Sequence, residues 1–171
     1  MSQTLASFEG NRIPDFRTPR NFIRWLIENK IGRDLSMDAA ADKSNAVVEY
    51  YYDEETNGLT SPWFGVVWCN PPYGREISQW VEKAAKEIQR AEVESIWMLV
   101  PARTDTQWFH EIVIPNAYLV YLIKGRINFN HKTSIKGANA PFPSMLILYR
   151  KHKLPDAEIT VLDVPKEARS D

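Results

Sequence analysis

The stretch VVWCNPPYG, residues 66–74, ends an apolar run on an amide, two prolines and an aromatic ring. Prolines cannot continue a β-ladder, and each one restricts the residue before it to extended geometry. The side-chain oxygen of Asn70 and the carbonyl of Pro71 can then point the same way, as paired acceptors for an exocyclic amino group. Pro72 completes the rigid turn, and Tyr73 offers a ring on which a planar group can stack. Because an amide takes no proton at neutral pH, Asn70 would position that amino group and not act as a base.

The segments around this turn alternate between strand-like and helix-like patterns. TPRNFIRWLIENKIG predicts a helix with Thr18 as its N-cap, Pro19 at the first helical position and Gly32 just past its end. Apolar residues on one face predict an amphipathic helix over 77–90. Residues 42–52 fit neither pattern. The other expected elements are a short strand in DLSMDAAA that stops near Asp38, the strands GVVWC (65–69), SIWMLVP (95–101), AYLVYLIKGRINF (117–129) and SMLILYR (144–150), and the helix DTQWFHEIVI (105–114).

This order of elements predicts an α/β fold, with a mostly parallel sheet covered by helices and a C-terminal antiparallel hairpin. In such sheets ligands bind outside the carboxyl ends of the strands. Asp38, Asn70 and the loop 101–106 all follow predicted strands, so we expect them to converge on one edge, where we place the site. The expected division of the chain is a loose segment at 1–17, a single domain at 18–154, and a tail at 155–171 that either adds an edge strand, EITVL, or frays.

Composition favours a soluble intracellular protein. With 171 residues, of which 44% are hydrophobic and 25% charged, the chain can form one domain with a sizeable core. The one cysteine, Cys69, excludes an internal disulfide framework and favours a reducing compartment. No apolar segment approaches membrane-spanning length and the polar start does not resemble a signal peptide, so we expect a cytoplasmic protein. Three histidines and one cysteine, widely spaced, do not make a metal site.

Charge is unevenly distributed, although the net charge is only −1. No acidic residue occurs over 112–155. A basic stretch of this kind predicts a footprint for a polyanion, which the whole-chain pI of about 6.3 hides. The alternative is a solvated basic face on an ordinary domain. The basic residues of the stretch are Lys124, Arg126, Lys132, Lys136, Arg150, Lys151 and Lys153.

Several segments together resemble the phage-type DNA N-6-adenine methyltransferases, which depend on S-adenosylmethionine. NPPYG looks like the catalytic motif of methyltransferases that act on planar amino nitrogens, although glutamine and RNA methyltransferases share it. The ordered set of segments is more specific, and it covers roughly residues 16–149. In order, these segments are RTPRNFIRWL, MDAAADKSNAVV, VVWCNPPYGREISQWVEKA, LVPARTDTQWFH, GRINF and PSMLIL.

The resemblance implies S-adenosylmethionine as the cofactor and assigns residues to it. The first cofactor loop would be residues 38–40, where small side chains let the backbone approach the ligand; the alternative is a plain strand-to-helix turn. Thr18 and Pro19 would match a cofactor-contacting segment, or else only a helix start. Asn57 stands where an acidic residue is expected, and its amide could still bond the cofactor's adenine. The implied cofactor-binding set is Thr18, Pro19, Asp38, Ala39, Ala40, Asn45, Asn57 and Asn70.

The resemblance also implies a Rossmann-like class I methyltransferase sheet, from which this sequence departs in two ways. No glycine-rich loop follows the first strand, and only residues 39–69 separate Asp38 from Asn70, so part of the usual sheet is expected to be abbreviated. There is also no room for a separate target-recognition domain, so sequence preference would come from loops. The candidate DNA contacts are Arg103, Arg126, Lys132 and Lys136.

The implied reaction is methyl transfer to the N6 amino group of adenine in DNA, without a metal. The base would be flipped out of the duplex and held on Tyr73. If a phage or prophage encodes the protein, it would act in the cytoplasm of a bacterial host. The alternatives left open are an RNA adenine, the N4 amino group of cytosine, a protein glutamine amide, or an inactive DNA-binding module.

Overall fold

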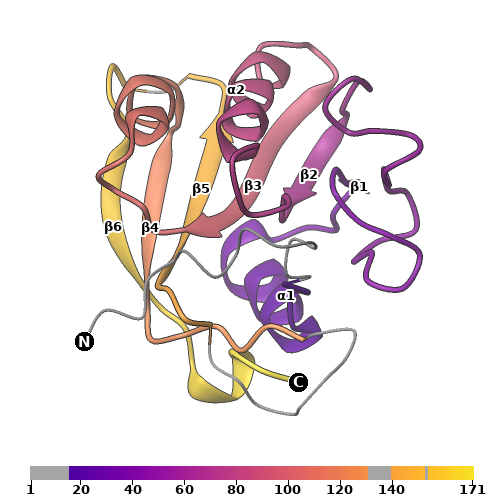
Figure 1. Cartoon of the computed structure of the whole chain (residues 1–171), viewed down its shortest axis with the longest axis vertical. Coiled ribbons are helices and arrows are strands. Elements are labelled where there is room, and N and C mark those ends of the chain that lie inside the picture. The colour runs from indigo at the N-terminus through magenta and orange to yellow at the C-terminus, as the bar shows by residue number, and fades with distance from the viewer. Residues whose placement is uncertain (1–15, 131–139, 153) are drawn as a thin grey trace.

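The computed structural model describes residues 16–130, 140–152 and 154–171, and within them six strands form one sheet (Figure 1). The strand order is β1-β2-β3-β5-β4-β6. β5 runs antiparallel to its neighbours β3 and β4, and the other neighbouring pairs are parallel. The mostly parallel sheet with antiparallel pairing near its C-terminal strands is therefore as predicted. The strands are Met37–Asp38 (β1), Gly65–Cys69 (β2), Val93–Pro101 (β3), Leu119–Lys124 (β4), Ser144–Arg150 (β5) and Glu158–Asp163 (β6).

The first helix ends where the sequence predicts and begins one residue later. Gly32 closes it in the left-handed conformation, with φ of 73°. At the other end Pro19, not Thr18, is the N-cap, and no side chain caps the helix from that position. The Thr18 hydroxyl instead accepts a hydrogen bond from Asn70, which is why the predicted cap does not form. The helical segments are Arg20–Leu26 (α1), Ile27–Ile31 (η2), Ile77–Glu87 (α2), Phe109–Val113 (η3), Ile114–Asn116 (α3) and Lys166–Ala168 (η4).

The central strands are apolar on both faces because helices cover both. α2 lies in front of the sheet in Figure 1, and the Tyr149 hydroxyl donates to the Val81 carbonyl of α2 at 3.4 Å. On the other face, Phe22 of α1 meets the edge of Trp68 at 6.4 Å between ring centroids. Strands buried on both faces read as continuous apolar runs, which is the pattern of β2, β3 and β5.

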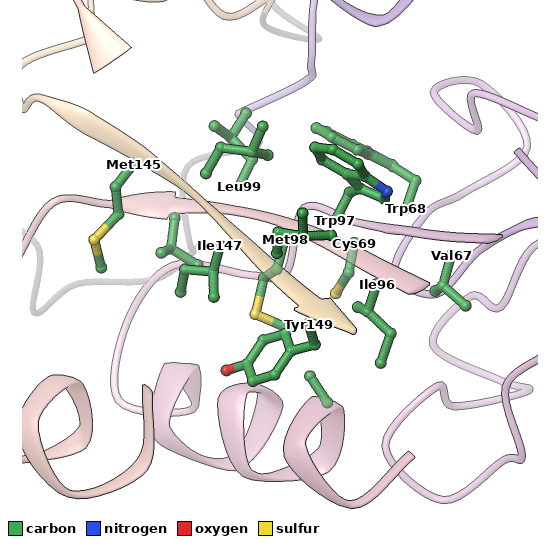
Figure 2. Close-up of a cluster of buried hydrophobic side chains, with 14 of the residues drawn as sticks. Val67, Trp68, Cys69, Ile96, Trp97, Met98, Leu99, Met145, Ile147 and Tyr149 are labelled. Carbon is green, nitrogen blue, oxygen red and sulfur yellow. The ribbon is translucent and has the colours of Figure 1, made fainter. Parts of the chain in front are cut away.

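Figure 2 shows how alternate residues of these strands divide between the two faces. Trp68, Trp97 and Leu99 lie on one side, while Met98 and Tyr149 lie on the other, toward a helix. All five are buried. Packing at this density leaves little room for the strands to shift, so the strand ends occupy fixed positions at the edge of the sheet.

The chain between β1 and β2 contains no further strand over 39–64, a range that the structure describes throughout. It is built of turns and bends, with one isolated parallel bridge between Asp38 and Tyr51. The unassigned segment 42–52 falls here. The loop folds back against β1, since a Cβ added at Gly58 would overlap the Ala39 carbonyl oxygen. β1 and β2 are therefore neighbouring parallel strands joined by an irregular loop.

Residues 158–163 of the tail belong to the sheet. β6 pairs in parallel with β4 from Leu119↔Glu158 to Lys124↔Asp163, so the tail takes the edge-strand alternative. η4 then brings Asp171 to the start of α1, where its carboxylate accepts from the backbone N–H of Asn21 at 2.9 Å. Among the described residues, none of the helices is long and apolar enough to cross a membrane.

Candidate active site

Three neighbouring parallel strands end at one edge of the sheet. Asp38 pairs with Trp68 of β2, which in turn pairs with Trp97 of β3. Asp38 therefore ends one strand, and Asn70 and the loop after Pro101 follow the next two strands of the sheet, as the sequence predicts. β4 ends at the same edge, because β3 and β4 both run antiparallel to β5. In Figure 1 the arrows of β2 and β3 point toward the region where α1, the segment after β4 and the C-terminus lie.

Asn70 is held in one orientation. Its Nδ2 donates to the Phe16 carbonyl at 2.6 Å and to the Thr18 hydroxyl at 3.0 Å. A carbonyl oxygen can only accept, so the nitrogen must face Phe16 and Oδ1 must face the other way. Oδ1 is buried and has no hydrogen-bond partner within the described residues. Asn70 thus presents an oriented acceptor that the described chain does not use.

The two prolines after Asn70 differ in exposure. Pro71 is buried and Pro72 is exposed. No hydrogen bond to the Pro71 carbonyl is formed by the part of the chain that the structure describes. Within the described residues, the Pro71 carbonyl and Asn70 Oδ1 are thus two acceptors in consecutive residues for which no donor is found.

The ring of Tyr73 is not open to a planar group, contrary to the sequence expectation. Only 7% of Tyr73 is exposed, and its hydroxyl donates to the Leu99 carbonyl at 3.2 Å. Phe16 stacks on its face, with 5.4 Å between ring centroids and 26° between planes. Phe129 and Phe142 contact Tyr73 edge-on, at 83° and 79°. The expected stacking surface exists, but Phe16 covers it.

Phe16, Phe129 and Phe142 are site residues that the sequence pattern does not single out. Each lies outside the regular helices and strands, and Phe129, which the sequence places at the end of a strand over 117–129, follows β4, which ends at Lys124. A weaker signal was present, because Phe16 and Phe129 adjoin or belong to segments that carry the family resemblance. Together with Tyr73, these three residues form what we call the aromatic cluster.

Asp38 braces the loop that follows β1. Its Oδ1 accepts from the Ala40 N–H at 3.3 Å and its Oδ2 from the Val47 N–H at 3.2 Å. The side chain is almost fully buried, and this burial raises the pKa of Asp38 to about 7, while the two backbone hydrogen bonds and Arg20 act in the opposite direction. Next to it Ala39 is fully buried and Ala40 is partly exposed. Asp38 therefore shapes this loop, and Ala40 is the member of 38–40 that reaches its surface.

The side-chain oxygens of Asn45 and Asn57 each accept a hydrogen bond from a nearby backbone N–H. Asn45 Oδ1 accepts from the Asp42 N–H at 2.7 Å, and the Asp42 carboxylate pairs with Arg17 at 3.2 Å. Asn57 has φ of 47°, a conformation that asparagine tolerates well, and its Oδ1 accepts from the Leu59 N–H at 3.0 Å. These bonds give both asparagines a local structural role next to β1.

The segment that carries Phe16 and Thr18 is tied to distant parts of the chain. Arg17 and Asn130 exchange two backbone hydrogen bonds, at 3.0 and 2.9 Å. The Asn130 side chain donates to Asp171 at 2.6 Å, and Asp171 also accepts from Asn21 at the start of α1. Pro19 is buried within this arrangement. The residues that orient Asn70 are thus fixed by the chain after β4 and by Asp171.

The fold divides the described part of the basic stretch 112–155 between two edges, so its described members do not form the one-sided footprint that the sequence suggests. Arg103 and Arg126 are exposed and follow β3 and β4, at the edge that holds Asn70. Antiparallel β5 carries the chain back, so Arg150 and Lys151 lie at the opposite edge. Lys124 is paired with Asp163 at 2.8 Å. The other two candidate DNA contacts, Lys132 and Lys136, lie outside the described residues.

In the part of the chain that is described, no three His, Cys, Asp or Glu side chains gather as a metal site would require.

Comparison with known proteins gives a family match and a curated relative. A curated relative from Escherichia phage T1, a DNA N-6-adenine-methyltransferase, is 38% identical over 112 residues, which are 61% of this chain and 44% of the relative. The chain thus spans less than half the length of that relative. The family described as DNA N-6-adenine-methyltransferase (Dam) matches residues 11–170, nearly the whole chain. The protein therefore belongs to the DNA N-6-adenine-methyltransferase (Dam) family.

Proposed function

We propose that this protein transfers a methyl group from S-adenosylmethionine to the exocyclic N6 amino group of adenine in DNA. The observation that carries the proposal is the acceptor at Asn70. Its Oδ1 is buried, oriented by two hydrogen bonds on Nδ2, and without a donor among the described residues. A buried acceptor without a partner costs free energy, so its retention favours a ligand that donates to it. Membership of the Dam family supports adenine in DNA as that ligand.

The residues at the ends of β1 and β2 fit the cofactor. Small residues meet there, because Ala39 and Gly58 pack backbone against backbone, and Ala40 is partly exposed beside them. Backbone and amide groups of this kind suit a polar nucleoside. S-adenosylmethionine supplies an electrophilic methyl group when bound. We assign its binding to the set Thr18, Pro19, Asp38, Ala39, Ala40, Asn45, Asn57 and Asn70, with Thr18 and Asp38 acting through Asn70 and the loop after β1.

Asn70 and Pro71 would activate the amino nitrogen by geometry. The lone pair of the adenine amino group is delocalised into the ring, which makes the nitrogen a weak nucleophile. Acceptance of its two hydrogens by Asn70 Oδ1 and the Pro71 carbonyl favours a pyramidal nitrogen with a localised lone pair. The nitrogen would then take the methyl group in one displacement, with the carbon–sulfur bond breaking and the demethylated cofactor as the leaving group, and would give up a proton to water. Asn70 itself takes no proton, because an amide is not basic at neutral pH.

The target base must leave the duplex to reach this acceptor, because its amino group is otherwise engaged in pairing. The aromatic cluster would receive it, with Tyr73 as the stacking partner. Arg103 and Arg126 are exposed at the same edge and would contact the phosphate backbone. Lys132 and Lys136 complete the proposed DNA contacts. The Rossmann-like class I type of sheet, in abbreviated form, is part of the same proposal.

Methyl transfer from labelled S-adenosylmethionine tests the proposal. Unmethylated DNA, RNA and bulk protein are each incubated with the enzyme, and digested DNA is analysed for N6-methyladenine by mass spectrometry. We expect label in DNA, as N6-methyladenine. Label only in RNA or protein, or none with a folded sample that binds the cofactor, would overturn the proposal.

Two asparagine variants test the acceptor itself. Asn70→Ala should lower turnover by on the order of 100- to 1,000-fold, as loss of one preorganised polar contact does. Asn116→Ala is the matched control, because its amide also donates to a backbone carbonyl, Ile112 at 2.8 Å, but at the end of α3 and away from the strand ends. Equal turnover in the Asn70→Ala variant and the wild type would reduce NPPY to a structural turn.

A further inference from the structure

Phe16 occupies the ring face of Tyr73 on which a target base would stack. The two rings are 5.4 Å apart and 26° from parallel, which is a stacked pair. Phe142 meets both rings edge-on, at 78° to Phe16 and 79° to Tyr73. Phe16 also contacts Asn70 through its backbone, since the Phe16 carbonyl accepts a hydrogen bond from Asn70 Nδ2. Phe16 therefore lies both against the stacking residue and beside the acceptor.

In this conformation a base can neither stack on the ring of Tyr73 nor donate a hydrogen bond to Asn70 Oδ1. Asn70 Oδ1 is buried and Tyr73 is 7% exposed, so entry of a base requires a side chain to move. Phe16 is the residue whose removal would uncover the Tyr73 face. Phe129 and Phe142 contact Tyr73 at its edge, so their movement would leave that face covered.

We infer that the Phe16 ring holds the place of the target base and rotates away when a planar base with an exocyclic amino group enters. The inference rests on the proposed function and adds a residue to its base-binding site. A phenyl ring mimics the flat, apolar face of a base and offers no donor to Asn70 Oδ1. The exchange of Phe16 for a base would thus keep the stack on Tyr73 and add the hydrogen bond that Oδ1 lacks.

The ring can leave without disturbing Asn70. Arg17 is bonded through its backbone to Asn130 in both directions, and the Thr18 hydroxyl bonds Asn70 independently. The backbone that directly follows Phe16 is therefore anchored. Rotation about the Cα–Cβ bond moves the ring and leaves the carbonyl on Nδ2. Phe16 would then have two separate roles, since its carbonyl positions the acceptor and its ring controls access to it.

Free bases can test this by isothermal titration. Adenine and purine differ only in the exocyclic amino group, so both are titrated into the wild type, Phe16→Ala and Phe142→Ala. Phe16→Ala should bind adenine between about 2-fold and 10-fold more tightly than the wild type, which is the range for the Phe16–Tyr73 stack alone, the contact that a base on Tyr73 would replace. Phe142→Ala, the matched control, removes an edge contact from the same cluster and should give no such gain.

A double variant ties the opened space to the acceptor. Phe16→Ala should prefer adenine over purine, and Asn70→Ala in the Phe16→Ala background should lose that preference and still bind purine. Equal or weaker adenine binding by Phe16→Ala would overturn the inference, as would a preference for adenine that survives loss of Asn70. Circular dichroism checks folding, and Phe16→Leu, which removes the ring but keeps an apolar side chain, should show a smaller gain in the same direction if the alanine variant is unfolded.

The outcome is independent of the proposed reaction. Tighter adenine binding by Phe16→Ala, together with no N6-methyladenine in DNA treated with the wild type, would keep the role of Phe16 and refute the methyltransferase proposal. Methylation by the wild type without the gain in adenine binding would do the opposite and assign Phe16 to a fixed wall of the site.

Discussion

Asn70 needs both ends of its amide. Nδ2 donates to the carbonyl of Phe16 and the hydroxyl of Thr18, and Oδ1 is left to accept. A carboxylate would keep the acceptor but could donate to neither partner, and it would place an oxygen against the Phe16 carbonyl oxygen. An amide at position 70 is thus required by the bonds that Nδ2 donates to Phe16 and Thr18, as well as by the amino group that Oδ1 is proposed to bind.

Asn70→Asp should therefore show a different pH dependence from the wild type. Near pH 8 we expect turnover to be lower by roughly 10- to 100-fold, which corresponds to one unsatisfied buried polar contact. Acidification should recover part of the loss, because a protonated carboxyl can donate to the Phe16 carbonyl again. The measurement is the pH profile of labelled methyl transfer for both proteins. Parallel profiles would show that the orientation of Asn70 does not depend on these two bonds.

The burial of Asp38 leads to a second prediction, which concerns how the stability of the fold depends on pH. Its pKa in the folded protein is about 7, mainly because of burial, against an ordinary value of 3.8. The folded protein then binds an extra proton between these values, so the contribution of Asp38 to stability is present below about pH 4 and is lost as the pH rises to about 7. The full loss is roughly 4 kcal/mol, at 1.36 kcal/mol per pKa unit.

Urea unfolding at pH 5 and pH 8 measures this effect. Asp38→Asn removes the titration, so its free energy of unfolding should fall less between the two pH values than that of the wild type. A constant cost is also expected, because the new amide nitrogen would face a backbone N–H. Asp34→Asn, at an exposed position, should follow the wild type. An unchanged pH dependence in Asp38→Asn would mean that the carboxyl is not buried as described.

Among the helices and strands, those with a strong local pattern could be predicted from the sequence. GVVWC, SMLILYR and the amphipathic helix at 77–90 match β2, β5 and α2 within a few residues. Gly32 also ends its helix as expected, because the left-handed conformation there is a local requirement. The convergence of Asp38 and Asn70 followed from strand order alone. These features depend on short-range periodicity and on the parallel sheet.

The features that could not be predicted depend on contacts between distant residues. Thr18 has the right residue type for an N-cap, but Asn70, far along the chain, takes its hydroxyl. The cover on Tyr73 comes from Phe16, which lies in no periodic segment. In each case tertiary structure overrides a reading that was reasonable for the local sequence.

Asp171 supplies the cap that α1 lacks. No side chain caps the helix at Pro19, and the Asp171 carboxylate accepts from the Asn21 N–H and from Asn130. Asp171→Ala should therefore lower the free energy of unfolding by about 1 kcal/mol, the usual value of an N-cap. It should also weaken binding of S-adenosylmethionine, because Thr18 lies directly before the released helix end.

Urea unfolding and isothermal titration check the two effects together. Asp156→Ala, at an exposed position in the same part of the chain, serves as the control and should change neither quantity. Unchanged stability in Asp171→Ala would show that water replaces the carboxylate at the helix end. Lower stability with unchanged cofactor affinity would separate the helix end from the cofactor site.

Over the whole protein, positive charge is arranged by strand direction. The strands that end beside Asn70 deliver Arg103 and Arg126 to that edge, whereas β5 delivers Arg150 and Lys151 to the other. Arg150 also lies over the Tyr118 ring at 5.3 Å, and Lys151 donates to the Ala91 carbonyl at 3.2 Å. These basic residues are therefore separated, and of the four only Arg103 and Arg126 lie at the edge of the proposed site.

DNA affinity should reflect this division in its dependence on salt. If Arg103, Arg126, Lys132 and Lys136 each meet a phosphate, the logarithm of the binding constant should fall against the logarithm of salt concentration with a slope of roughly −4. Arg126→Glu should weaken binding to all sequences similarly and reduce the slope by about 1 or more, since it removes one phosphate contact and adds a repulsion. Lys151→Glu, the control at the opposite edge, changes the net charge equally and should leave the slope unchanged.

Fluorescence anisotropy with a labelled duplex at several salt concentrations measures the affinity of the wild type and both variants. Equal slopes for the two variants would contradict a footprint confined to the edge that holds Asn70.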